Sequence, residues 1–201
     1  MSLRFLPETG DVLLWHWESF LPGGIIAAVE GNPRSHAAIC IVLSGVPFQI
    51  GAEGSGVIMR PLENDVRLGS DIKVRRIRPA LGSNYPCGPR GHTPRRDGLG
   101  IGWQRQLAEY ALGCVGVLGY SDSDLVANLW RQLLTPDWAP EDAAEGMPAR
   151  VMCSQFVTLL LRKFRRYPVV PGVPAASVSP GDLDETSYLE TVCERLELTA
   201  E

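Results

Sequence analysis

The spacing of hydrophobic positions divides the chain into an N-terminal part of strands and a later part of helices. Short apolar or alternating runs bounded by glycine and proline turns predict strands, and these cover residues 12–17, 37–43, 48–53, 57–61 and 71–78. Residues 188–198 predict a further strand or a short helix. Helical spacing of apolar residues, together with helix start and stop signals, predicts helices over residues 22–30, 103–114, 121–134 and 150–167.

This order of elements indicates the fold class. The connections between the early strands are too short for crossovers, so we expect an antiparallel meander. Strands followed by helices favour an α+β fold, with an antiparallel sheet packed against helices.

The segment 150–167, R-V-M-C-S-Q-F-V-T-L-L-L-R-K-F-R-R-Y, predicts the helix around which the rest of the chain is organised. Basic residues fill its last turns, where cations suit the negative end of the helix dipole. Pro148 lies just before the segment and Pro168 ends it. Cys153 therefore falls in the first turn, where the positive dipole end favours a thiolate. A plain packing role is the alternative, because cysteine is among the most buried residue types.

Length, composition and charge narrow the class of protein. With 201 residues, 45% of them hydrophobic, the chain predicts one domain over residues 1–201 with a buried core. The net charge of −4 and the pI of about 5.5 argue against a nucleic-acid partner, which favours a basic face. No apolar run reaches the ~18 residues of a membrane span, and the N-terminus lacks a signal-peptide pattern. We therefore expect a cytoplasmic protein without a membrane span, and the oligomeric state stays open.

The five cysteines are widely spaced and include no C-x-x-C pair. This pattern predicts neither a disulfide framework nor a zinc site, and it fits a reducing compartment. We expect no metal and no cofactor. The candidate chemistry is then that of a cysteine nucleophile, which needs a base within hydrogen-bond reach and a group that orients the base.

The chain offers three histidines as candidates for the base. His36 has the best position, because it begins the buried strand at residues 37–43 and a strand gives rigid support. His16 ends the first strand between two tryptophans, and His92 lies in the irregular segment 79–102.

The group that orients the base is expected on a neighbouring strand. Antiparallel pairing brings the end of strand 48–53 beside the start of strand 37–43, which makes Glu53 a neighbour of His36. Glu53 is therefore the candidate orienting carboxylate. The weaker polar candidates are Gln49, Asp11 and Gln155.

Several stretches of the chain resemble one known family when they are taken in order. They are G-D-V-L-L-W (10–15), I-I-A-A-V-E-G-N-P-R-S-H-A-A-I-C-I-V (25–42), G-A-E-G-S-G-V-I-M-R-P-L (51–62), G-V-L-G-Y (116–120), V-M-C-S-Q-F-V (151–157) and S-P-G-D-L (179–183). Their order and spacing resemble the circularly permuted branch of the NlpC-type papain-like cysteine peptidases, the YiiX-like group. The resemblance runs over residues 10–185, nearly the whole chain.

The resemblance implies a permuted papain-like fold in which the histidine and its partner precede the cysteine. It implies Cys153 as the nucleophile, His36 as the base and Glu53 as the carboxylate that orients the imidazole. The implied activity is hydrolysis of an amide bond in a peptide or peptidoglycan-type substrate through an acyl-enzyme. The sequence departs from the group at Arg34, where the group often has an aromatic residue, and in the segment 79–102.

Two other functions fit the same resemblance. An acyltransferase or lipid-directed thioesterase, as in the related lecithin retinol acyltransferase-like proteins, would act on an acyl substrate in an apolar groove beside Cys153. The segment 168–178, P-V-V-P-G-V-P-A-A-S-V, is a candidate wall for such a groove. A non-catalytic binding domain would keep the fold with an unreactive Cys153 thiol, since fold does not fix function.

Overall fold

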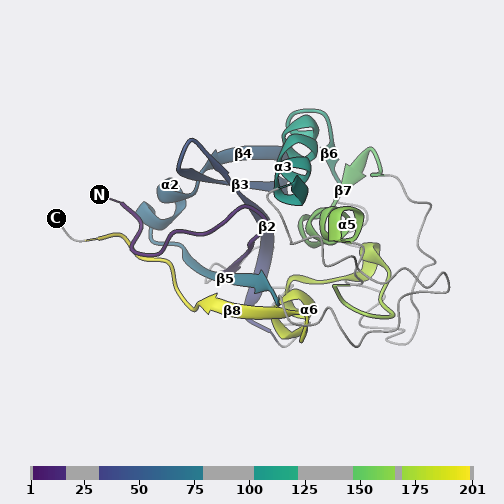
Figure 1. Ribbon diagram of the computed structural model, residues 1–201. Coiled ribbons are helices and arrows are strands. Elements are labelled where there is room, and N and C mark those ends of the chain that lie inside the picture. Colours follow the sequence, from purple (N-terminus) through teal and green to yellow (C-terminus); the bar gives the residue numbers. More distant parts are fainter. Residues whose placement is uncertain (1, 17–31, 79–101, 122–146, 166–168, 200–201) are drawn as a thin grey trace.

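A six-stranded antiparallel sheet forms the centre of the molecule, which Figure 1 shows as a computed structural model. The structure describes residues 2–16, 32–78, 102–121, 147–165 and 169–199. The strand order across the sheet is β4 (Gly56–Pro61), β3 (Val46–Glu53), β2 (Arg34–Leu43), β1 (Val12–His16), β5 (Asp71–Ile77) and β8 (Leu189–Cys193). Every neighbouring pair is antiparallel.

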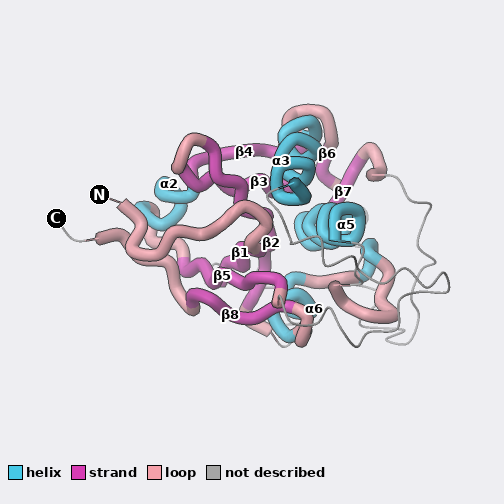
Figure 2. Tube along the Cα trace, viewed as in Figure 1, coloured by secondary structure: helices cyan, strands magenta, loops and turns pink. Residues whose placement is uncertain are grey.

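Helices lie on both sides of this sheet (Figure 2). The helices α3 (Gly102–Cys114), α5 (Cys153–Arg165) and α6 (Pro180–Glu185) pack in one hydrophobic cluster with the sheet. Helix α2 (Leu62–Arg67) and the two chain ends pack in a second cluster on the other side. The remaining short elements are β6 (Gly119–Tyr120), β7 (Arg150–Val151) and the 3-10 helix η2 (Ala175–Ser177).

Strand β2 supplies both faces of the sheet, because successive side chains of a strand point to opposite sides. Ala37 and Ile39 belong to the cluster that includes Phe156 of α5. Cys40 belongs to the cluster that includes Leu62 of α2. All of these side chains are fully buried, and burial of a large apolar side chain stabilises the fold by about 1.5–3 kcal/mol. We call the two sides of the sheet the α5 face and the α2 face.

The structure confirms the α+β class and all five of the early strands that the hydrophobic pattern predicts, with ends shifted by up to three residues. The last predicted element is a strand, β8. The predicted meander is wrong at one point, because β5 pairs with β1 and not with β4. Helix α2, which the pattern did not predict, connects the edge strand β4 to β5, which lies beyond β1 in the sheet. Its six residues, L-E-N-D-V-R, are too few to show a helical repeat.

The helix predicted over residues 150–167 begins later than expected. Its first two residues form β7, which pairs in parallel with β6, and the helix itself starts at Cys153. Gly119 and Tyr120 of the G-V-L-G-Y stretch form β6. The S-P-G-D-L stretch at residues 179–183 opens α6, whose N-cap Ser179 and Asp182 form a capping box.

Some predictions fall on residues that the structure does not describe. They are the helix at residues 22–30, most of the helix at residues 121–134, and nearly all of the segment 79–102 with His92. In the described part of the chain, no helix is both long and apolar enough to cross a membrane.

Gly56 gives a test of how β4 docks against β6. It has φ +113°, and a Cβ there would stand 2.5 Å from the carbonyl oxygen of Leu118. We expect Gly56→Ala to lower the free energy of unfolding by more than the ~1–2 kcal/mol cost of a left-handed backbone alone, because that carbonyl also accepts the N–H of Val57. Urea denaturation measures the change.

Gly69→Ala is the matched control, because Gly69 has φ +85° and nothing within 4 Å of an added Cβ. It isolates the backbone cost from the clash. An equal loss of stability in both variants would contradict the close approach of β4 and β6.

Candidate functional site

Cys153, His36 and Glu53 lie toward one end of the sheet. The antiparallel pairing of β2 with β3 places the start of β2 beside the end of β3, which carries Glu53. Strand β4 begins opposite Glu53, and the N–H of Val57 donates to the carbonyl of Leu118 over 2.9 Å. Leu118 leads into β6, which pairs with β7 directly before α5. The start of α5 therefore lies at the same end of the sheet as the other two residues.

Cys153 is the first residue of α5 and is 5% exposed. The N–H of Met152 donates to Oε1 of Gln155 over 3.2 Å, which fixes the chain where the helix starts. The hydroxyl of Ser154 donates to the carbonyl of Val178 over 2.5 Å and ties the first turn to the segment before α6. The thiol therefore stands at the positive end of the helix dipole, in a turn held on both sides.

The imidazole of His36 lies on the α2 face of the sheet. Its ring packs edge-on against Trp15, with the centroids 5.1 Å apart, and its Nε2 lies 3.8 Å from Oε1 of Glu53. The absence of a side chain at Gly51 leaves room for the ring, since a Cβ there would be 3.3 Å from Nε2. Trp15 belongs to the cluster of the α2 face, whereas the body of α5 packs on the opposite face.

The neighbourhood of His36 and Glu53 that the hairpin predicts is thus present in the structure. The structure does not bring the imidazole of His36 onto the face that α5 covers. The role of Cys153, His36 and Glu53 as a catalytic set stays a prediction that rests on the resemblance.

The other polar candidates have structural partners. Gln49 donates to Asp65 of α2 over 3.1 Å. Asp11 accepts two hydrogen bonds from Arg76, at 2.7 and 2.8 Å, and Gln155 caps the start of α5. His16 lies 3.7 Å from Asp71. We therefore keep these residues out of the candidate site.

Burial sets the proton affinities in this region. Burial, together with the smaller effect of the positive charge of Arg60, lowers the pKa of His36 from 6.5 to about 4. The imidazole is therefore neutral at pH 7. Burial raises the pKa of the Cys40 thiol, and it raises the pKa of the thiols of Cys114 and Cys193 as well, which disfavours the thiolate form of each.

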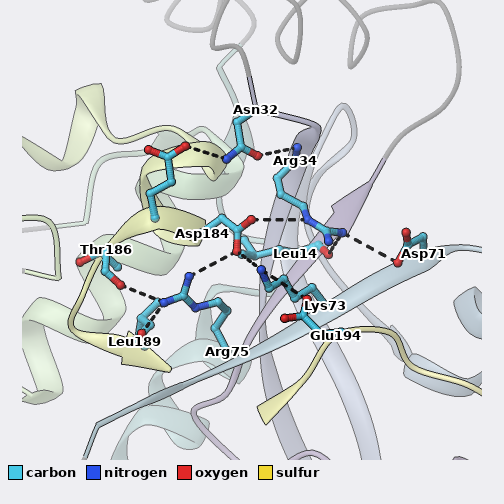
Figure 3. A network of polar contacts seen from close by, with 11 residues as sticks. Leu14, Asn32, Arg34, Asp71, Lys73, Arg75, Asp184, Thr186, Leu189 and Glu194 are labelled. Carbon is cyan, nitrogen blue, oxygen red and sulfur yellow. Dashed lines mark hydrogen bonds and ion pairs between the residues drawn. The ribbon is translucent and has the colours of Figure 1, made fainter. Parts of the chain in front are cut away.

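A network of charged side chains joins α6 to the sheet on the α5 face (Figure 3). Its centre is Asp184, which lies 2.8 Å from Nζ of Lys73, 3.3 Å from Nη1 of Arg75 and 3.7 Å from Nε of Arg34. Arg75 also donates to the carbonyls of Thr186 and Leu189. One carboxylate thus connects β2, β5 and α6.

This network also reaches the start of α5. Asp184 holds α6, α6 begins directly after Val178, and Val178 accepts the hydroxyl of Ser154. Arg34 belongs to the same network and stands two residues before His36 in β2. Asp184 therefore helps to fix both the strand of the candidate base and the helix of the candidate nucleophile.

Sequence reasoning did not single out Arg60, Asp184 or Gly51. Arg60 lies in the predicted strand 57–61 and Asp184 follows the S-P-G-D-L stretch. A solvated side chain is the usual expectation for a charged residue. Gly51 precedes Glu53 by two residues, so it points to the same side of β3 as Glu53. That spacing was the one sequence signal that a small residue leaves room beside the histidine.

The described residues do not contain a group of three or more His, Cys, Asp or Glu side chains placed to hold a metal ion. His36 supplies one ring nitrogen and Glu53 two carboxylate oxygens, and both oxygens are already paired with Arg60, at 3.0 and 2.8 Å. These residues do not fit a metal centre, so no step of the chemistry below is assigned to a metal.

The fold and the site define an α+β protein with a buried cysteine at the first position of the helix that packs on its sheet. No family model and no curated protein matches the chain. Among solved structures it is similar to the crystal structure of the metalloprotein yiiX from Escherichia coli O157:H7, with a TM-score of 0.63 and 18% sequence identity. The match covers 94% of this chain and 98% of that chain. The similarity shows a shared YiiX-like fold, and at this identity it carries no activity over.

Removal of the central carboxylate of the network should destabilise the protein. The Asp184 side chain is 12% exposed, and loss of one partner of a buried ion pair costs about 3–5 kcal/mol because the other charges stay buried. We expect Asp184→Asn to lower the free energy of unfolding by about 3 kcal/mol in urea denaturation.

Glu194→Gln is the control, because Glu194 is 76% exposed and reaches only Lys73, at 3.5 Å. Exposed ion pairs contribute about 0–1 kcal/mol, so its loss should be close to the error of the measurement. Equal effects of the two variants would contradict the central place of Asp184.

The lowered pKa of His36 predicts a pH-dependent stability. The unfolded chain binds this proton below pH 6.5, and the folded protein binds it only near pH 4. The contribution is therefore fully present above pH 6.5 and is lost as the pH falls toward 4, by about 3 kcal/mol in total.

The measurement compares urea denaturation of wild type and His36→Phe at pH 7 and near pH 4.5. The variant keeps an aromatic ring against Trp15, which His36 contacts edge-on, and it cannot titrate. We expect a smaller loss of stability between the two pH values in the variant. The same loss in both proteins would mean that other groups cause the acid sensitivity.

Proposed function

We propose that this chain is a cysteine hydrolase that cleaves an amide bond in a peptide or peptidoglycan-type substrate. Cys153 is the nucleophile, His36 the base, and Glu53 the carboxylate that orients the imidazole. The residues 1–201 form one domain of permuted papain-like type. The YiiX-like fold supports this proposal, and the resemblance of the sequence motifs to permuted NlpC-type peptidases supplies the activity.

The position of Cys153 as the first residue of α5 is the observation that carries the proposal. A helix start stabilises a thiolate through its dipole. Two hydrogen bonds hold this turn, from Met152 to Gln155 and from Ser154 to Val178, so the thiol has a fixed position. A fixed nucleophile at the end of a sheet is suited to attack on a carbonyl carbon.

The reaction follows from these roles. The neutral imidazole of His36 takes the proton of the Cys153 thiol, and the sulfur attacks the amide carbonyl. The tetrahedral intermediate collapses, the C–N bond breaks, and the imidazolium gives its proton to the leaving amine. Water then attacks the thioester, with the imidazole again as the base, and releases the carboxylic acid and the thiol.

One structural demand on this mechanism is specific to the present chain. The imidazole lies on the α2 face and α5 on the opposite one. The two must therefore meet around the start of β2, where the pairing with β1 shifts register between Trp15 and His16 and leaves Ser35 as an extra residue. His36 follows this irregularity directly.

A non-catalytic binding domain is the second candidate, and the burial of His36 on the α2 face favours it. An imidazole buried beside Trp15 with a pKa near 4 is a weak base. In this reading His36 and Glu53 stabilise the sheet, and Cys153 is a buried packing residue.

The experiment that separates the two candidates is alkylation by iodoacetamide between pH 6 and 8, with the modified cysteine assigned by mass spectrometry. We expect Cys153 to react at least ~10-fold faster near pH 6.5 than an ordinary thiol. We also expect His36→Ala to abolish that advantage. Cys193 serves as the ordinary thiol for comparison, because it is partly exposed and its pKa is raised. Cys193→Ala should leave the reaction at Cys153 unchanged.

Each result of the alkylation has a different consequence for the hydrolase proposal. Fast reaction at Cys153 that His36→Ala slows supports the cysteine hydrolase. Reaction at Cys153 no faster than at Cys193 contradicts it and leaves the binding domain. Fast reaction that His36→Ala does not change keeps the nucleophile and removes His36 as its base.

A further inference from the structure

Arg60 of β4 holds two carboxylates on the α2 face at once. Its Nη1 donates to Oε2 of Glu53 over 3.0 Å, and its Nη2 lies 2.8 Å from Oε1. Its Nε lies 2.9 and 3.2 Å from the two oxygens of Asp65 in α2. Gln49 donates to Asp65 from the other side. The guanidinium is therefore anchored to α2 while it holds the carboxylate beside His36.

The atoms that Glu53 and His36 present to each other lack hydrogen bonds within the described part of the chain. Nε2 of His36 and Oε1 of Glu53 are both buried and without a hydrogen-bond partner there. They face each other over 3.8 Å, which is longer than the ~2.7–3.2 Å of an N–H···O bond. The short approach of Nη2 of Arg60 to Oε1 is an ion pair whose geometry does not make a hydrogen bond. A shift of less than ~1 Å would close the gap between imidazole and carboxylate.

The contacts of Glu53 explain why this gap stays open. Arg60 binds both of its oxygens, and Asp65 keeps Arg60 in place. His36 cannot move away freely, because it lies between Trp15 and the backbone of Gly51. The carboxylate is thus drawn toward the guanidinium and held away from the imidazole.

We infer that Arg60 is a positioning residue that keeps Glu53 paired to itself and off His36. The structure shows the pair in this latched arrangement, and loss of Arg60 releases Glu53 to accept a hydrogen bond from Nε2 of His36. The catalytic meaning of the latch rests on the proposed function, because only then does the bond between Glu53 and His36 orient a base. The geometric claim stands without it.

The charge of Arg60 also weakens the interaction between Glu53 and His36. The charged groups that face His36 from the elements around it are Glu53 of β3 and Arg60 of β4, with Asp65 of α2 behind the guanidinium. Arg60 offsets the negative charge of Glu53, so the carboxylate does little to favour an imidazolium. Without Arg60, the carboxylate acts on the imidazole with its full charge, and an opposite charge at ~4–6 Å raises the pKa of a histidine.

The test is an NMR titration of the His36 ring protons, assigned by comparison with His36→Phe. It uses the full chain with Cys153→Ala and no substrate. We expect Arg60→Met to raise the pKa of His36 by about one unit or more, and Glu53→Gln in the Arg60→Met protein to reverse that rise. Arg60→Lys should restore much of the low pKa, because it returns the positive charge without the fork.

Two further variants keep the test decisive. Arg60→Met leaves Asp65 buried without its cation, so Arg60→Met with Asp65→Asn is the variant to use if the single change unfolds the protein. Arg67→Met is the matched arginine control, because Arg67 pairs with Glu63 on the exposed side of α2, and it should leave the titration unchanged. A His36 pKa unchanged in both Arg60→Met proteins would overturn the latch.

The titration and the alkylation test the latch and the hydrolase proposal independently. The titration has no need of Cys153 or of turnover, so an inert thiol leaves the latch standing as a structural device. If the latch fails while His36→Ala still slows alkylation of Cys153, the hydrolase proposal stands and Arg60 has no part in it.

Discussion

The alternation of side chains along β2 is the constraint on which the rest of this structure depends. Ala37 and Ile39 face α5, while His36 and Cys40 face the side of α2. A shift of one residue in the register of β2 would exchange the two sets, and each set would then meet the cluster that is packed to fit the other. The same constraint fixes which functional groups can meet. It places His36 beside Glu53 and Trp15, and it leaves the body of α5 packed on the other face.

Each face of the sheet carries one cluster of charged side chains. On the α5 face, Asp184 connects three cationic side chains and docks α6 (Figure 3). On the α2 face, Arg60 connects Glu53 to Asp65 and docks α2. Each cluster joins a short helix of six residues to the sheet. Helices of this length are not stable alone, so charged contacts and a few buried side chains fix their positions.

The sequence was informative where a periodic pattern or a hairpin determines structure. Five strands, helix α3, most of helix α5 and the proximity of His36 to Glu53 follow from local patterning and antiparallel pairing. The pairing of β5 with β1 did not follow, because a chain that leaves β4 through α2 can return on either edge of the sheet. His36 shares a face of β2 with Cys40 by simple alternation, but the pattern did not show that α2 covers this face and α5 the other. Arg60 and Asp184 carry charges that look solvated in a sequence, and only the packing of α2 and α6 makes them central.

The measurement that tests this account most directly is a proton NOE spectrum of the wild-type protein at neutral pH, with the His36 ring assigned. The account predicts cross-peaks from the imidazole protons to the indole of Trp15 and to the α-protons of Gly51, which are its neighbours on the α2 face. The absence of both sets of cross-peaks would contradict it. In that case β2 does not present His36 on the α2 face, and the latch formed by Arg60 does not exist.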